Sequence, residues 1–488
     1  MTGIDTSTTT SGTAGRPRRP HALRSRLHTS SQDLIFGDPL RRFVLVSFAL
    51  MGIALVMVAV AVARAPQMSI TDEPAHAGYL YLIAHGQIPG AGTLIPKEIR
   101  YESYCHNLAG STGSSVCTGF STSGYMAGSQ VYTFGDPPVY YLITGLLDRL
   151  ISPFVPGTHN FITVGRDLGA VWLFAGMVVL YVAVRKFRVS WPYAFAAAAL
   201  LPLCPGVLAA SSQITSDAPA ALCGALALYA LARITVDRKL GLIVPFLLTM
   251  FTTGTKVLNG MPMLVVGGIA LVMALAAARR RDWHSARRPF LLSVVIGLGF
   301  LVTYLGWNEY QERRADPNWI NPNLGNGTAL TGSPVGDLLS NLFGTFQHLT
   351  TSYWLAPQIN GETMVIWATL LCVLFGAAPF VLMVVSRPRS WGWILGLSTF
   401  AGISAVALTV EAQVFTSNDQ YFAIVAGRYA LDFLPWAIVC LAVVAYRRRL
   451  LRTTFSFVSL GLAVMLLAEF GVLNLGPALS SSTSFLVG

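Results

Sequence analysis

Charged residues are scarce in this chain, at 11% of 488 residues, whereas 53% of the residues are apolar. Soluble globular proteins carry about 25% charged residues, so this composition excludes that class. Apolar runs of 17–23 residues recur along almost the whole chain, and runs of that length form transmembrane helices. We therefore expect an all-α polytopic membrane protein.

Acidic residues are fewer than basic ones, 22 against 33, which leaves a formal charge of +11. Nucleic-acid-binding proteins often carry such an excess, but here the basic residues form short clusters between apolar runs. This is the positive-inside pattern, so we expect the charge to orient the protein in the membrane, with no nucleic acid as partner. The clusters lie at residues 185–188, 279–288, 387–389 and 447–452.

Placing these clusters inside predicts about 11 spans, a cytoplasmic N-terminus and an outer C-terminus in a bacterial plasma membrane. Residues 1–42 read as a disordered basic cytoplasmic tail, residues 43–475 as the transmembrane domain and residues 476–488 as an outer tail. The first span would be an uncleaved signal anchor. The predicted spans are 43–63, 165–184, 191–210, 217–234, 240–253, 257–278, 290–307, 363–385, 391–410, 429–446 and 453–473.

Two long segments fall outside the membrane on this path, residues 64–160 and residues 308–362. Loops of this length in a compact protein are usually functional. Within the first loop, residues 78–86 and 138–153 are expected to form helices in the membrane interface. The alternative for 138–153 is another span, although the segment is short and contains Asp148 and Arg149.

Cysteines are also few, six in all, and they divide by location. Cys204, Cys223, Cys372 and Cys440 lie in or near apolar helices, where small buried residues are ordinary. Cys105 and Cys117 lie in the first outer loop. Because that loop is predicted to be extracytoplasmic, we expect a disulfide between them.

Candidate catalytic residues begin directly after the first span, where Asp72, Glu73 and His76 follow one another. A paired acid at the membrane surface suits proton chemistry, and Asp72 and His76 are four residues apart on one helix face. The alternative is a helix start, with Asp72 as the cap and Pro74 in the first turn. Asp136 is either the cap of the next helix or a second carboxylate facing Asp72.

Two cations are candidates for binding a phosphate, Lys256 and Arg428. A lone charge in a span costs about 2.5–3.5 kcal/mol on insertion scales, so Lys256 needs an anion, a water-filled cavity or a route to the surface. Arg428 suits phosphate through its planar fork and Tyr429 adds a hydroxyl, the alternative being an ion pair between Arg428 and Asp432. Asp217, in a short outer hairpin, is read as a helix cap.

Three motifs give the chain a resemblance to bacterial multi-pass glycosyltransferases of the GT-C superfamily. They are TDEPAHAGYLYLIAHGQIP at 71–89, DPPVYYLITGLL at 136–147 and GRYALDFLPW at 427–436. The nearest subgroup has a Pro-Asp-Glu-Pro-x-His motif. This chain departs from it by carrying Ile70-Thr71 before the acid pair.

The resemblance implies a membrane glycosyltransferase that moves a sugar from a polyprenyl phosphate to an envelope glycan or glycolipid, with inversion or retention left open. Asp72 would be the general base, with Glu73 the less favoured candidate. Arg428 and Lys256 would neutralise the leaving phosphate, assisted by His76 and Tyr429. Some relatives need a divalent metal; Asp72, Asp136 and His76 offer ligands for Mg, Mn or Ca, but their spacing requires none.

The host is expected to be a GC-rich bacterium, because arginine outnumbers lysine 29 to 4. For an actinobacterium, the resemblance implies a decaprenyl-phosphate sugar donor and a role in cell-wall biogenesis. The alternative function is a transporter or flippase of a lipid-linked sugar, although no repeat between the halves supports it. A third interpretation is a scaffold for envelope assembly.

Overall fold

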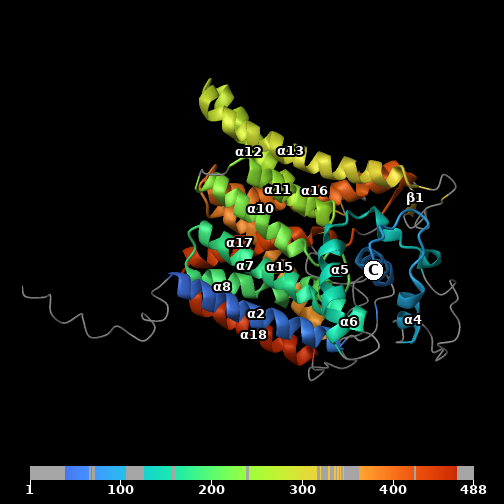
Figure 1. Cartoon of the computed structure of the whole chain (residues 1–488). Coiled ribbons are helices and arrows are strands. Elements are labelled where there is room, and N and C mark those ends of the chain that lie inside the picture. Colours follow the sequence, from blue (N-terminus) through green and yellow to red (C-terminus); the bar gives the residue numbers. More distant parts are fainter. Residues whose placement is uncertain are drawn as a thin grey trace, which may run out of the picture. The chain divides into compact units, whose positions relative to one another are not determined.

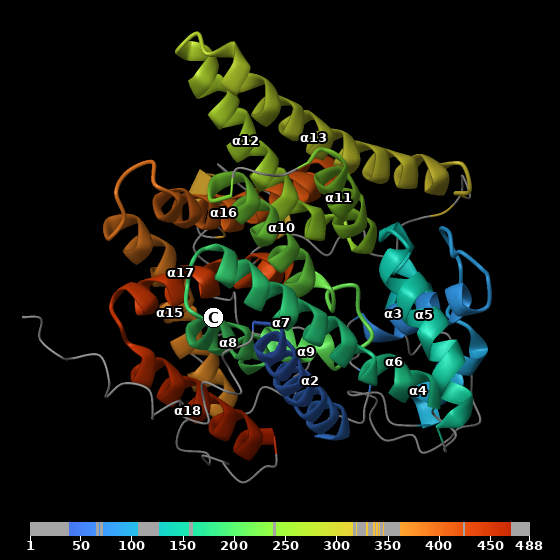
Figure 2. The same ribbon diagram turned by 60° about the vertical axis from the view of Figure 1, so that its left-hand side comes forward.

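The computed structural model describes residues 39–64, 68, 72–105, 126–155, 160–237, 241–315, 319, 328–329, 335–336, 338–339, 341, 345, 362–422 and 425–469. Helices dominate these residues (Figures 1 and 2). The α-helices are α2 (Pro39–Arg64), α3 (Glu73–Ala84), α4 (Lys97–Cys105), α5 (Val139–Ile151), α6 (Asn160–Asp167), α7 (Gly169–Lys186), α8 (Trp191–Ala199), α9 (Pro205–Ser211), α10 (Ala220–Thr235), α11 (Ile243–Thr255), α12 (Met261–Arg279), α13 (Trp283–Glu312), α15 (Glu362–Val384), α16 (Trp391–Asn418), α17 (Leu434–Arg447) and α18 (Leu451–Glu469).

Short elements connect these helices. The 3₁₀ turns are η2 (Met126–Ser129), η3 (Tyr132–Gly135), η4 (Ser152–Phe154), η5 (Leu201–Leu203), η6 (Leu258–Gly260) and η7 (Gly427–Phe433). Two strands of two residues each, β1 (Thr328–Ala329) and β2 (Gln420–Tyr421), pair antiparallel, with Thr328 opposite Tyr421. This pairing joins the second long loop to the segment that precedes Arg428.

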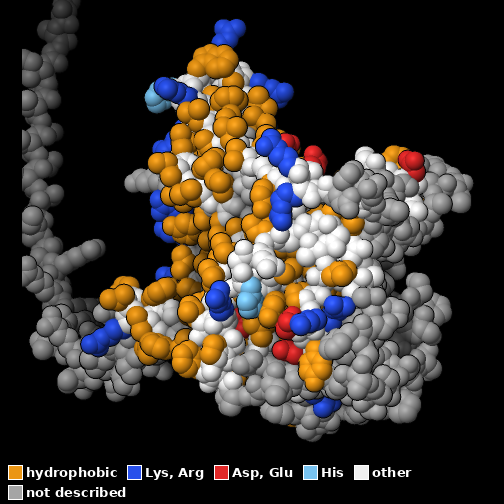
Figure 3. Space-filling view, turned by 45° about the vertical axis from the view of Figure 1, so that its right-hand side comes forward, with side chains coloured by type: hydrophobic (Ala, Val, Ile, Leu, Met, Phe, Trp, Pro, Cys, Tyr) orange, Lys and Arg blue, Asp and Glu red, His pale blue; other side chains and the backbone are white. Residues whose placement is uncertain are grey.

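The protein is an all-α polytopic membrane protein. Within the described residues, seven helices are long and apolar enough to span a bilayer, and the α8–α9 pair, bent by 70°, would be an eighth. Three further apolar helices, near residues 220–235, 243–255 and 451–467, are shorter. Each of the predicted spans coincides with one of these elements, and the count of eleven stays a prediction. On α12 and α13, exposed apolar side chains gather below a tip that carries several arginines (Figure 3).

The two helices predicted for the first loop are present as α3 and α5, and they pack against each other. At 1.5 Å per residue, the 13 residues of α5 reach about 20 Å, short of the roughly 30 Å hydrocarbon layer. Their packed surface is aromatic, with Tyr79, Tyr140 and Tyr141 almost fully buried. A location in the membrane interface stays a prediction for both.

Arginines occupy the sharp turns between consecutive helices. The non-glycine residues with positive φ in the described chain include Arg188, Arg281, Arg389 and Arg449, at φ of 62°, 59°, 65° and 57°. Each belongs to one of the four basic clusters, and each lies between two helices of a hairpin: α7 and α8, α12 and α13, α15 and α16, or α17 and α18.

Candidate active site

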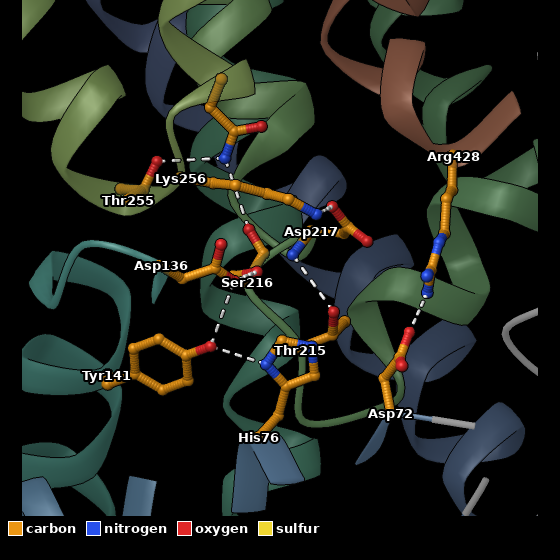
Figure 4. A network of polar contacts seen from close by, with 11 residues as sticks. Asp72, His76, Asp136, Tyr141, Thr215, Ser216, Asp217, Thr255, Lys256 and Arg428 are labelled. Atoms are coloured by element: carbon orange, nitrogen blue, oxygen red, sulfur yellow. Dashed lines mark hydrogen bonds and ion pairs between the residues drawn. The ribbon is translucent and has the colours of Figure 1, made fainter. Parts of the chain in front are cut away.

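Asp72 is held by two partners at the start of α3. Its Oδ2 lies 2.6 Å from Nη1 of Arg428 (Figure 4). Its Oδ1 accepts a 2.8 Å hydrogen bond from the Tyr132 hydroxyl. Asp72 occupies the cap position of α3, yet its side chain makes no capping hydrogen bond. The carboxylate is therefore committed to residues of η3 and η7 rather than to its own helix.

The electrostatic surroundings keep Asp72 ionised. Burial by itself raises the pKa of this carboxyl, but the charge of Arg428, with His76 and the Tyr132 hydroxyl, outweighs burial and brings the pKa to about 2. The Asp72 and Arg428 side chains are 19% and 14% exposed, so the pair lies at the edge of the protein interior and can be reached from outside.

Lys256 forms a second pair, deeper in the site. Its Nζ lies 2.6 Å from Oδ1 of Asp217, and this carboxylate is only 3% exposed. The Lys256 side chain therefore does not snorkel to the surface. The backbone at Lys256 is extended, with φ −166° and ψ 141°, so α11 stops there and the side chain leaves the helix direction.

Tyr429 lies between the two cations. Nζ of Lys256 is 5.5 Å from the centre of its ring, and Cζ of Arg428 is 5.4 Å away. Both are cation–π distances. Three of the four residues that the sequence assigned to phosphate, Lys256 after α11 and the neighbours Arg428 and Tyr429 of η7, therefore form one group.

Asp136 heads a network of hydroxyl groups. Its Oδ2 accepts a 2.6 Å hydrogen bond from Ser216 and a longer one, 3.4 Å, from Tyr141 (Figure 4). The Tyr141 oxygen also lies 2.6 Å from Nδ1 of His76. Burial lowers the pKa of His76 despite the nearby carboxylates, which favours the neutral imidazole. Asp136 is not the cap of α5, since Pro138 occupies that position.

Glu73 points away from this group. Its two oxygens accept hydrogen bonds of 2.7 and 2.8 Å from Nε and Nη2 of Arg166 on α6, and Oε1 also accepts one from the backbone N–H of Ile214. The side chains of this pair are 4% and 1% exposed. Glu73 thereby ties α3 to the start of the next span.

A clamp behind η7 fixes the segment that carries Arg428. Asn341 donates to Glu411 on α16 at 2.8 Å and to the backbone oxygen of Phe422, and its own oxygen accepts from Val425 N–H. On the other side of η7, the backbone oxygen of Asp432 packs directly on Gly224 of α10, where a Cβ would overlap it. The alternative pair of Arg428 with Asp432 is not formed, because Arg428 is bound to Asp72.

An apolar cavity opens beside the polar network. It has a volume of about 550 Å³ and lies between α11, α13 and the beginning of α5. Its lining includes Pro137, Pro138, Gly254, Thr303, Gly306 and Trp307. Pro137 follows Asp136 in the chain and Gly254 lies two residues before Lys256, so the cavity lining is close in sequence to two of the polar residues.

Among the residues that the structure describes, no three His, Cys, Asp or Glu side chains are grouped as metal ligands. Asp72, Asp136 and His76 each contact a different partner. The requirement for a divalent cation therefore stays a prediction, and no step below uses one. Cys117 and the side chain of Cys105 lie outside the described residues, whereas Cys204, Cys223, Cys372 and Cys440 are buried as expected.

Sequence reasoning missed several polar residues of the site. Tyr132 and Ser216 hydrogen-bond the two acids, and Asn259 donates to the backbone oxygen of Ser216 and to Thr255. Asp217, read as a cap, is the partner of Lys256 instead, while Pro219 precedes α10. A signal was present, because a lone lysine between two apolar helices needs a carboxylate and the nearby hairpin offers one.

Comparisons with known proteins match this chain to a family over part of its length and to solved structures. Residues 136–307 match the model of a family described as dolichyl-phosphate-mannose-protein mannosyltransferase. Among solved structures, the chain is similar to ArnT from Cupriavidus metallidurans, crystallised bound to undecaprenyl phosphate, with 16% identity and a TM-score of 0.46. That match covers 89% of this chain and 64% of the other, so this chain spans less than two thirds of that protein. No curated protein matches the chain.

Proposed function

We propose that the protein is a membrane glycosyltransferase that uses a polyprenyl-phosphate sugar and acts on the outer face of the membrane. The observation that carries the proposal is the pair of cations, Lys256 and Arg428, on one tyrosine ring, in a protein that also has an apolar cavity lined by Gly254 of α11. A ligand with a phosphate head and a long apolar tail fits both parts. The family match over residues 136–307, which includes Asp136, Asp217 and Lys256, supports the same chemistry.

In this mechanism the polyprenyl chain lies in the cavity and its phosphate contacts Arg428 and Lys256. Asp72 removes the proton from the acceptor hydroxyl, and the resulting oxygen attacks the anomeric carbon of the sugar. The bond between that carbon and the phosphate oxygen breaks, and polyprenyl phosphate leaves with its negative charge on the two cations. The acceptor is an envelope glycan or glycolipid.

Glu73 is not the base in this proposal. Both of its oxygens are occupied by Arg166, and the pair is sealed from solvent. Asp136 is the second acid of the site, and its carboxylate accepts the hydrogen bonds that hold Ser216 and Tyr141. His76 and Tyr429 support the site through Tyr141 and the cations, respectively.

The test uses purified protein in lipid nanodiscs with a panel of polyprenyl-phosphate sugars and envelope glycan acceptors. Release of polyprenyl phosphate is measured for the wild type, Asp72→Asn and Asp419→Asn. A positioned base typically contributes 10²–10⁴-fold in rate, so Asp72→Asn should lose almost all release. Asp419 is exposed at the left-handed end of α16, where Asn is equally at home, so its variant should match the wild type.

A second candidate function is transport of a lipid-linked sugar. The observation that favours it is the interruption of the apolar segment at Lys256, because transporters bind substrates at broken helices. The same experiment separates the two functions. Saturable donor binding without release, unaltered in Asp72→Asn, would replace the glycosyltransferase with the transporter.

A further inference from the structure

The site contains a conflict between the proposed base and its surroundings. A general base works best when its pKa lies near the operating pH, yet the Arg428 charge and the Tyr132 hydroxyl hold the pKa of Asp72 at about 2 although burial opposes them. Both carboxylate oxygens of Asp72 are also occupied, one by Arg428 and one by Tyr132. In the ligand-free arrangement Asp72 is therefore a weak and obstructed base.

A donor phosphate would compete for the group that weakens Asp72. Arginine binds phosphate and carboxylate oxygens with the same planar, charge-assisted geometry, so one Nη1–H cannot serve both fully. Nε of Arg428 is buried and has no hydrogen-bond partner among the described residues, so part of the fork makes no hydrogen bond in the ligand-free arrangement. The Lys256 pair is the poorer target, because Asp217 is 3% exposed and Asp72 is 19% exposed.

We propose that Asp72 occupies the place of a donor phosphate oxygen on Arg428, and that the arriving phosphate displaces it and so turns it into the base. Asp217 stays on Lys256 and keeps that cation in position. The inference rests on the proposed function and adds an order of events to it: the donor binds before Asp72 can act as the base. Without donor, Asp72 is neutralised by Arg428 and cannot activate an acceptor hydroxyl or water; with donor, it is released beside the phosphate.

The first test is a double-mutant cycle on binding, with polyprenyl phosphate as the probe and no sugar or acceptor present. Asp72→Asn removes the internal competitor, so we expect the dissociation constant to fall by about 5- to 100-fold, the equivalent of about 1–3 kcal/mol. In the Arg428→Gln background the same change should give no gain, because the contested group is absent. If Asp72 only repelled the phosphate at long range, its removal would tighten binding by a similar factor in both backgrounds.

The outcomes separate this inference from the proposed function. If the wild type binds polyprenyl phosphate and Asp72→Asn binds it equally or more weakly, the displacement is overturned and the glycosyltransferase proposal stands. A gain in binding that persists without Arg428 has the same consequence. No polyprenyl phosphate binding by the wild type overturns both. Asp217→Asn is the comparison for the second cation. Because it removes the carboxylate that anchors Lys256, we expect it to give no gain in polyprenyl phosphate binding that depends on Arg428.

A second test needs only the wild type, in case a variant fails to fold. Among the described residues, the charged and titratable groups that act on Asp72 are Arg428 of η7, His76 of α3 and Tyr132 of η3. Once the phosphate takes Arg428, the pKa of Asp72 should return to or above its ordinary value of 3.8. At saturating donor, kcat should then fall about tenfold per pH unit below that value. A rate that stays level down to pH 3 would contradict the displacement.

Discussion

Replacing Glu73 by Gln tests whether the second acid of the pair is structural. The change removes the negative charge from a pair whose side chains are 4% and 1% exposed, so the buried Arg166 guanidinium loses the carboxylate that its Nε and Nη2 both contact. Breaking a buried pair in this way typically destabilises a protein by 3–5 kcal/mol. At roughly 2 °C per kcal/mol for a large chain, we expect the unfolding midpoint to fall by about 6–10 °C.

A matched control lies on α13, where Glu309 and Arg313 form an ion pair with the same 2.7 Å distance but with side chains 58% and 75% exposed. Exposed pairs contribute about 0–1 kcal/mol, so Glu309→Gln should leave the midpoint nearly unchanged. The assay is the fraction of monodisperse protein that survives heating in detergent, followed by size-exclusion fluorescence. If Glu73→Gln kept wild-type stability but lost transfer, the structural assignment would be refuted and Glu73 would act on substrate.

Three further predictions concern the elements around the site. A Cβ at Gly306 meets open space in the cavity lining, so Gly306→Phe should narrow the cavity and weaken binding of a long-chain polyprenyl phosphate about tenfold while sparing a short-chain analogue. Gly297→Phe, on the same helix but not in the lining, should bind both normally in a nanodisc binding assay. Gly224→Ala should push α10 off η7, lowering both thermal stability and kcat, whereas Gly268→Ala on α12 meets open space and should behave as wild type. Glu411→Gln should loosen the clamp on Phe422 and raise the KM for donor several-fold through Arg428; an unchanged KM would show that the clamp does not position that residue.

The positions of the membrane helices are readable from the sequence because hydropathy is local: each apolar run must satisfy its own backbone, so a run of sufficient length is a helix. Each predicted span coincides with an apolar helix, including the interrupted segment at 191–210. The helices of the first loop were also predictable, since Pro74 and the Pro137-Pro138 pair mark where they begin.

The pairing of charges was not readable in the same way. An ion pair between Arg428 and Asp432, four residues on, was an alternative because sequence reasoning favours local partners. The actual partner, Asp72, lies 356 positions earlier in the chain. Glu73 and Arg166, or Lys256 and Asp217, likewise meet only through tertiary packing. Tyr132 and Ser216 carry no charge and belong to no obvious motif, so nothing in the sequence separates them from ordinary loop residues.

The four hairpin arginines have a consequence for how the chain is made rather than for what it does. A non-glycine residue in the left-handed region costs on the order of 1 kcal/mol, and glycine would be the relaxed choice at each turn. The predicted topology places these turns on the cytoplasmic side, and the chain carries there the residue whose charge retains a loop on that side during insertion. Replacing these arginines by glycine should therefore ease the finished fold while increasing the share of molecules inserted upside down. At these turns, biosynthesis and stability favour opposite residues.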